Sequence, residues 1–298
     1  MQVRYIIVKD HEGQRLDNFL LRELRPVPKS RIMQMIRRGE VRVNSKRARV
    51  GLRLNVGDRI RVPPLRLDPT PPKSIPKWLR ELTQQSVIYE DEKLIVLNKA
   101  TGIAVHAGGS IEVGLIDVLR ELYGDERIDL VHRIDKDTSG CVLVARSRVA
   151  MLEMHYAFQQ RKVAKHYDAI VKGAWPESLK SVNRPIERYV LPNGERRARV
   201  SESGPEAITA VSVREQCSNA SWITANPITG RTHQIRVHTA SVGHFILGDA
   251  KYSEPTPLPQ PPRLMLHASK ISVGDELAFE APLDGAFTDY WNLVGQAD

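Results

Sequence analysis

A loop rich in charged and hydroxyl side chains separates two apolar stretches in LVHRIDKDTSGCVLVAR, residues 130–146. A surface turn needs only residues such as Asp, Ser and Gly, which residues 137–140 would supply. The other polar side chains are therefore candidates for chemistry. Asp135 is the strongest of them, because a carboxylate on a short loop between two buried strands can be held in one orientation as a nucleophile or a base.

Two other chemistries need residues that this pattern lacks. Glycoside hydrolases use two carboxylates about 5 to 10 Å apart across one bond, and nothing near Asp135 and Asp137 indicates a separate apolar pocket for a second acid. His132, His155 and His166 do not follow a recognised metal-ligand spacing. We therefore predict a site without metal or cofactor.

A second polar segment, NPITGRTHQIRVHTASVGHFILGDAKYS, covers residues 226–253. TGRT predicts a turn and HQIRVH predicts a strand, in which His233 and Ile235 share one face and Arg236 lies on the other. Arg231, at the turn into this strand, is a candidate ion-pair partner for Asp135, because a facing arginine keeps an aspartate ionised and oriented.

A third segment, VIYEDEKLIVLNKATGIAVHAGG, begins at residue 87. It predicts strands at 87–89 and 94–97, then a strand, a turn at Gly102 and another strand. Lys99 and His106 either face a binding cleft or are the surface lysine and partly buried histidine of an ordinary hairpin. Both are retained as candidate binding residues.

One helix is predicted over SRVAMLEMHYAFQQRKV, residues 147–163, with Ser147 as its N-cap. Val149, Leu152 and Tyr156 follow the helical period and are expected to form its apolar face.

Composition sets the class of protein. With 298 residues, 41% hydrophobic and 27% charged, the chain is typical of a folded globular protein. No apolar run approaches the roughly 20 residues of a membrane helix, and the N-terminus lacks the apolar core of a signal peptide. Two cysteines 76 positions apart suit buried thiols in a reducing compartment. We expect a cytoplasmic protein without a membrane association.

The positive charge is concentrated in the first quarter of the chain. Residues 1–67 hold 17 Lys and Arg against 6 Asp and Glu, whereas the remainder holds 27 against 29. Such asymmetry is typical of a module that binds a polyanion. The proline-rich stretch that follows predicts an extended linker. The expected organisation is a basic domain at 1–67, a linker at 68–85 and a large domain at 86–298.

The basic domain has a clear pattern of two short helices followed by strands. Leu16, Phe19, Leu20 and Leu24 lie on one face of the first helix, which Pro26 and Pro28 would end; the second is expected to start at Ser30 and end at Gly39. SRIMQMIRRGEVRVN and VGDRIRV resemble the alpha-L RNA-binding module named after a small-subunit ribosomal protein. Its candidate phosphate-binding residues are Lys29, Arg31, Arg37, Arg38, Lys46, Arg47, Arg49 and Arg53.

The motifs of the large domain are similar, in order and spacing, to those of the RluA family of RNA pseudouridine synthases. The matching segments are NKATGIAVHAG, HRIDKDTSG, KHYDAIVKG and TGRTHQIRVHTASVGHFILGDAKY. The resemblance implies an α+β fold, with a mixed, mainly antiparallel sheet and a central cleft. It also implies a monomeric, cofactor-free isomerase that converts uridines of large-subunit ribosomal RNA to pseudouridine.

The resemblance also implies roles for individual residues. Asp135 matches the catalytic aspartate, Arg231 the arginine that pairs with it, and Tyr167 the tyrosine that packs on the base. Arg133 matches the arginine that fills the place vacated by the flipped nucleotide. Asp135 could attack the sugar, attack the base or remove a ribose proton.

Three alternatives stay open. The substrate could be transfer RNA or other ribosomal RNA positions. The chain could instead be a non-catalytic RNA-binding factor in ribosome assembly. A glycosidase or nucleosidase would need a second acid and a route for water.

Overall fold

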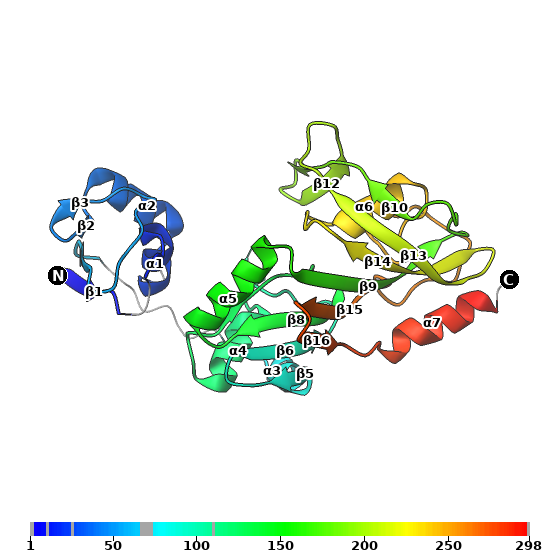
Figure 1. Cartoon of the computed structure of the whole chain (residues 1–298), viewed down its shortest axis with the longest axis horizontal. Coiled ribbons are helices and arrows are strands. Elements are labelled where there is room, and N and C mark those ends of the chain that lie inside the picture. Colours follow the sequence, from blue (N-terminus) through cyan, green and yellow to red (C-terminus); the bar gives the residue numbers. More distant parts are fainter. Residues whose placement is uncertain (1–2, 10–11, 25–26, 66–73, 109–110, 297–298) are drawn as a thin grey trace. The chain divides into compact units, whose positions relative to one another are not determined.

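A computed structural model describes residues 3–9, 12–24, 27–65, 74–108 and 111–296. The chain forms two compact units, Met1–Ser74 and Ile75–Asp298 (Figure 1). The predicted linker lies outside the described residues at 68–73. Its predicted end is wrong, because Lys77–Gln85 forms helix α3. The prolines stop at Pro76, and Leu79 is then buried in the core of the large unit.

The first unit packs two helices on a small sheet. Its elements are β1 (Arg4–Ile7), α1 (Leu16–Glu23), α2 (Lys29–Arg38), β2 (Arg42–Val43), β3 (Lys46–Arg47) and β4 (Arg59–Val62), with strand order β1-β4-β2-β3. The predicted apolar face of α1 is confirmed as buried core. Helix α2 begins one residue before Ser30, after Pro28, and ends at Gly39, whose φ of 72° closes it. Pro26 lies outside the described residues.

A ten-stranded sheet forms the framework of the second unit. Eight strands follow the order β10-β13-β14-β9-β15-β8-β6-β5, while β7 pairs with β8 and β16 with β15. Only β15 and β8 run parallel among the described pairs, so the predicted mixed, mainly antiparallel sheet is confirmed. The strands are β5 (Val87–Glu90), β6 (Leu94–Lys99), β7 (Asp129–Leu130), β8 (Ser139–Ala145), β9 (Val163–Lys172), β10 (Ser181–Asn183), β13 (Ile208–Gln216), β14 (Ala220–Pro227), β15 (Leu266–Val273) and β16 (Leu277–Glu280).

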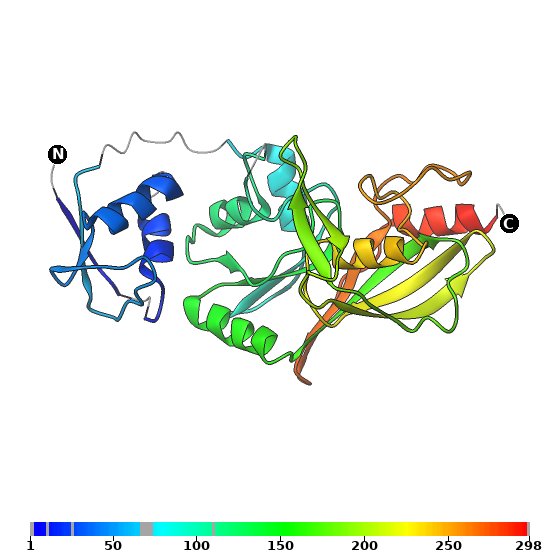
Figure 2. The same cartoon turned by 90° about the horizontal axis from the view of Figure 1, so that it is seen from above.

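Helices cover both halves of this sheet (Figure 2). Helices α3 and α4 (Leu115–Tyr123) pack on one face of β6 and β8, and α5 (Arg148–Gln159) packs on the other. On the other half, α7 (Gly285–Gly295) and α6 (Gln234–Ser241) contribute to a core with β9 and β14. A separate hairpin, β11 (Ile186–Val190) and β12 (Arg196–Val200), lies beside α6. No helix in the described ranges is long and apolar enough to span a membrane.

Helix α5 shows where periodicity was ambiguous. Ser147 is the N-cap as predicted, and its hydroxyl accepts a hydrogen bond from the amide of Ala150. The predicted apolar face is wrong, since Val149, Leu152 and Tyr156 are exposed. Residues of the adjacent face are buried instead: Ala150, Met151, Met154 and Ala157. Both sets fit a helical period, and the small and flexible side chains of the second set pack closely on a sheet.

The segment after Gly102 is not the predicted strand. Gly102 does make a turn, with φ of 80°, but residues 103–107 are irregular. Ile103 and Val105 are nevertheless buried, because the segment packs on the core beside α4.

Candidate active site

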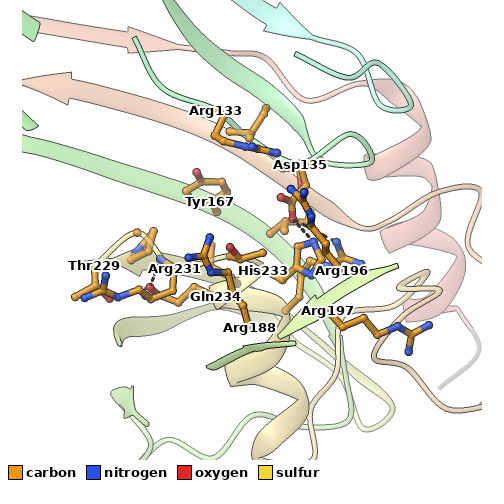
Figure 3. A pocket seen from close by; sticks show the side chains of 18 of the residues that line it. Arg133, Asp135, Tyr167, Arg188, Arg196, Arg197, Thr229, Arg231, His233 and Gln234 are labelled. Atoms are coloured by element: carbon orange, nitrogen blue, oxygen red, sulfur yellow. Dashed lines mark hydrogen bonds and ion pairs between the residues drawn. The ribbon is translucent and has the colours of Figure 1, made fainter. Parts of the chain in front are cut away.

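A cavity of about 660 Å³ opens in the large unit, within the range of pockets that hold small organic ligands. Four segments line it: the loop between β7 and β8, strand β9, the β11–β12 hairpin and the turn into α6 (Figure 3). Asp135 is the single acidic side chain among its described lining residues. The seven lysines and arginines that accompany it are Arg133, Lys165, Arg188, Arg196, Arg197, Arg231 and Arg236.

The Asp135 loop is tied to the preceding strand by its own carbonyl groups. The amide of Thr138 donates to the carbonyl of Asp135 at 3.2 Å, so the turn begins earlier than the predicted 137–140. Lys99 Nζ donates to the carbonyl of Lys136 at 3.0 Å, and Thr101 Oγ1 donates to that of Asp137 at 2.7 Å. The NKATG segment therefore anchors the loop that carries the carboxylate.

Lys99 is consequently wrong as an RNA-binding residue. It is 1% exposed, and its ammonium group also donates to the carbonyl of Ala100 at 2.8 Å. Burial lowers the pKa of Lys99 to about 7. A lysine enclosed in this way supports the loop and cannot reach a phosphate.

The arginine that contacts Asp135 is Arg236, and the predicted pairing with Arg231 is wrong. Arg236 Nη1 lies 3.3 Å from Asp135 Oδ2. Arg231 donates from Nε to the carbonyl of Glu206 at 2.8 Å, and its backbone amide donates to Gln234 Oε1 at 2.9 Å. Arg231 still lines the cavity and is exposed, so it can contact a bound molecule without holding the carboxylate.

This error follows from the secondary structure of the segment. HQIRVH was predicted as a strand, but Gln234–Ser241 forms helix α6. Every residue from Gln234 to Thr239 is buried, so the helix has no polar face that would show a helical period. His233 is the N-cap residue and has a left-handed φ of 52°. The helix points Arg236 at the Asp135 loop.

Arg236 is held from its other side by Asp249. Its Nε and Nη2 atoms donate to the two Asp249 carboxylate oxygens at 2.7 and 2.6 Å. The amides of Lys251 and Tyr252 donate to Asp249 Oδ1 at 2.9 and 3.3 Å. Although burial alone would lower it, the hydrogen bonds and charge of Asp249 raise the pKa of Arg236, which stays a cation. The guanidinium is thus fixed between two carboxylates.

Tyr167 and Arg133 both line the cavity, as the resemblance implied for an active site. Tyr167 is half-buried on β9, at the position that pairs with Ala225 of β14. Burial, and then the charge of Asp135, raise its pKa, so the phenol stays protonated at neutral pH. Arg133 is exposed on the approach to Asp135.

His106 does not join this group. It is exposed in the irregular segment after β6 and does not belong to the described lining of the cavity. Desolvation lowers its pKa, so it is neutral at physiological pH and adds no positive charge.

Seven of the eight candidate phosphate-binding residues in the first unit are exposed, and Arg31 is half-buried. Two of them also hold the fold. Arg47 Nη2 donates to the carbonyl of Arg37 at 2.6 Å, and Arg53 Nη1 donates to that of Gly13 at 2.7 Å. Arg31 lies 3.4 Å from Glu40. The first unit therefore offers a surface of exposed cations.

Sequence reasoning did not identify Arg236, Asp249, His233 and Tyr252 as site residues. All four lie inside the motif segment 226–253, so that resemblance could have indicated them, whereas periodicity could not. Within the described ranges, no group of three or more His, Cys, Asp or Glu side chains could hold a metal ion.

Comparisons with known proteins cover both units. A family model described as RNA pseudouridylate synthase matches residues 93–241, and an S4 domain model matches residues 14–60. The chain is 43% identical to ribosomal large subunit pseudouridine synthase C of Pasteurella multocida, over 93% of this chain and 89% of the relative. It is 39% identical to the protein of that name from Escherichia coli K12, over 93% and 92%.

A solved structure shows a similar fold. Human RNA pseudouridylate synthase domain containing 4 superposes with a TM-score of 0.62 at 26% identity, covering 73% of this chain and 95% of that one. Sequence and structure therefore indicate the same fold.

Proposed function

The chain belongs to the RNA pseudouridylate synthase family, and on that premise we propose that it isomerises uridines of large-subunit (23S) ribosomal RNA to pseudouridine with Asp135 as its catalytic carboxylate. The observation that carries the proposal is the composition of the cavity. One carboxylate, oriented by a buried arginine, lies among seven basic side chains. A polyanion with a single reacting centre fits this charge distribution.

The substrate is inferred from two features. Relatives that align over nearly the whole chain are named for the large ribosomal subunit. The S4 domain adds a second, exposed basic surface, which suits the shape-based recognition of structured RNA. Since ribosomal RNA is its proposed substrate, the enzyme would act in the cytoplasm. We propose that it acts as a monomer, because one chain supplies all the site residues described above.

The reaction needs no net gain or loss of atoms. The bond between uracil N1 and ribose C1′ breaks, the detached base turns within the cavity, and a bond from C5 to C1′ forms. The proton on C5 leaves, and N1 gains one. Asp135 is proposed to promote the cleavage, and the cavity would keep the free base close enough to rejoin.

The proposed roles of the other residues follow from their positions. Arg236 orients Asp135, and Asp249 holds Arg236 in place. Tyr167 offers an aromatic surface for the flipped base, with a protonated hydroxyl. Arg133, exposed on the approach, would occupy the gap left in the RNA stack. Arg231 would bind the RNA backbone.

The cavity disfavours a glycosidase or nucleosidase. Those enzymes pair an acid with a second carboxylate or base across the scissile bond. Asp135 is the only acidic side chain among the described residues of the cavity lining. The carboxylate of Asp249, on the far side of Arg236, is buried and already paired with that arginine.

Mapping pseudouridine in ribosomal RNA tests the proposal. Cells that lack the protein should lose pseudouridine at defined large-subunit positions, and the wild-type chain should restore it. Asp135→Asn should not restore it. Loss confined to transfer RNA would overturn the substrate, and full restoration by Asp135→Asn would overturn the catalytic residue.

A further inference from the structure

His233 faces the catalytic carboxylate from a backbone conformation that few residues adopt. Its φ of 52° lies in the left-handed region, which side chains other than Gly, Asn, Asp and His rarely enter. Its Nε2 atom lies 3.7 Å from Asp135 Oδ2, on the same oxygen that Arg236 approaches. Conformations of this kind tend to occur where surrounding contacts and function require them.

A chain of hydrogen bonds fixes which imidazole nitrogen carries the proton. The backbone amide of Ala198 on β12 can only donate, and it donates to Tyr252 Oη at 3.0 Å. Tyr252 Oη lies 2.6 Å from His233 Nδ1. With its lone pair taken by the amide, the phenol uses its hydrogen toward Nδ1. The neutral imidazole then bears its hydrogen on Nε2.

That hydrogen points at Asp135. The opposite tautomer would direct an Nε2 lone pair at the carboxylate, which is repulsive, and would turn an N–H of the ring toward the phenol hydrogen of Tyr252. Burial lowers the pKa of His233, which favours the neutral ring. A separation of 3.7 Å is long for a hydrogen bond, but catalytic contacts of this kind commonly shorten when substrate binds.

Tyr252 also connects the carboxylate to the β11–β12 hairpin. Its ring lies 5.2 Å from the Arg236 guanidinium and packs edge-on against His233. The neighbouring carbonyl of Lys251 accepts from Arg197 Nη1 at 3.0 Å, and Lys251 Nζ contacts Glu195 Oε1 at 2.7 Å. The hairpin that lines the cavity with arginines is therefore fastened to the residue that orients His233.

We propose that His233, held as its Nε2–H tautomer by Tyr252 and the β11–β12 hairpin, is a positioning residue that fixes the Asp135 carboxylate together with Arg236. The inference rests on the proposed function, because it acts through Asp135. His233 need not touch the RNA, and its contribution is to the rate of the chemical step.

The tautomer can be measured without any reaction. In protein labelled with ¹⁵N-histidine, the imidazole shifts and couplings distinguish Nε2–H from Nδ1–H, and His233→Gln identifies the signals. We expect the Nε2–H form in the wild type and a mixture in Tyr252→Phe. The Nδ1–H form in the wild type would overturn the assignment.

Two substitutions separate positioning from backbone geometry. His233→Gln places an N–H donor near the position of Nε2 but disfavours the left-handed backbone. His233→Asn tolerates that backbone but is too short to reach Asp135. Under saturating RNA, we expect single-turnover tritium release from 5-tritiated uridine to fall by about 10- to 100-fold in His233→Asn and clearly less in His233→Gln. RNA affinity should stay within a few-fold in both.

The outcomes are distinct. The exposed His155→Asn is the matched control and should keep the wild-type rate. Equal rates for His233→Asn and the wild type, or a slower His233→Gln than His233→Asn, would overturn the positioning role. If the wild type itself releases no tritium, the proposed function fails. Thermal melting identifies a variant that does not fold, and Tyr252→Phe, which keeps its ring, then tests the same hydrogen bond.

Discussion

At the scale of single residues, the position of Asp135 depends on a buried cation that serves two carboxylates. Arg236 donates two hydrogen bonds to Asp249 and approaches Asp135 with its remaining nitrogen. Removing one partner of such a buried group leaves the others unpaired and costs on the order of 3 to 5 kcal/mol. The site is therefore sensitive to the shape of this side chain as well as to its charge.

Arg236→Lys should expose that sensitivity. An ammonium group keeps the charge but cannot pair with both oxygens of Asp249 and still reach Asp135. We expect the rate of the chemical step to fall on the order of 100-fold. Arg231→Lys is the matched control and should chiefly weaken RNA binding, since Arg231 does not contact Asp135. Single-turnover rates and RNA affinities check both, and a greater decrease in rate for Arg231→Lys would contradict the assignment.

Lys99 should make stability depend on pH. Burial lowers its pKa from 10.5 to about 7 in the folded protein, so between these values the unfolded chain binds more protons than the folded one. Stability from this residue then rises with pH above 7, by up to about 1.4 kcal/mol per pH unit, and decreases again as the pH falls toward 7.

Lys99→Met removes that titration. The difference in unfolding free energy, wild type minus variant, should increase from pH 7.5 to 9.5. Urea unfolding followed by tryptophan fluorescence measures it, since all four tryptophans lie in the second unit. A constant or decreasing difference would show that Lys99 is charged in the folded protein throughout this range.

Residue chemistry was predictable where one type of side chain has few alternatives. A carboxylate between two buried strands indicated Asp135, and the motif context indicated Tyr167. Arg236 could not be found in this way, because it lies five positions after Arg231 and only the handedness of a helix turns it toward the loop. Lys99 was misassigned because a lysine is rarely buried, and one of its carbonyl acceptors comes from a segment 37 positions away.

At the scale of elements, the parallel pairing of β8 with β15 determines where the Asp135 loop ends. His267 and Ala268 pair with Ser139 and Gly140. Gly140 has φ of 109°, and a Cβ atom there would lie 2.2 Å from the carbonyl oxygen of Ala268. The two strands approach closely at this point because Gly140 has no side chain.

Gly140→Ala should therefore destabilise the second unit by about 2 to 4 kcal/mol, since both the backbone conformation and the close approach to Ala268 are unfavourable. Gly102→Ala is the matched control: its φ is 80°, but a Cβ there meets nothing within 4 Å. It should cost only about 1 kcal/mol. Urea unfolding of both variants checks this, and equal destabilisation would refute the steric explanation.

Most elements with a clear pattern could be predicted from the sequence, including the helices of the first unit, the strands around Asp135 and the N-cap of α5. Helix α6 could not be, because burial on all sides removes the polar face on which periodicity depends. The exposed apolar residues of α5 show the converse case. Two faces of one helix fitted the same period, and only tertiary packing selects between them.

At the scale of the whole molecule, basic charge is divided between two surfaces with different tasks. The second unit gathers its cations around one carboxylate, whereas the first unit carries an excess of 11 positive charges over residues 1–67 on an open surface. Phosphate contacts of the open kind contribute affinity that decreases steeply with salt and reads little sequence.

Deleting residues 1–74 should weaken RNA binding and flatten its salt dependence. For each phosphate that the shortened protein no longer neutralises, the slope of log K against log salt should decrease by roughly 0.7 to 0.9. The rate of the chemical step on a short RNA at saturation should change little, because the cavity lies within the second unit. Binding measured at several salt concentrations checks this, and an unchanged slope would place the interface elsewhere.

Tritium release from RNA labelled at carbon 5 of uridine tests the central claim most directly. Formation of pseudouridine replaces the hydrogen on C5 by the bond to ribose, so each turnover releases one label. The wild-type chain should release tritium from large-subunit ribosomal RNA, and Asp135→Asn, which alters only the ionisable group, should release none. Release that persists in Asp135→Asn would contradict the role of Asp135 as the catalytic carboxylate.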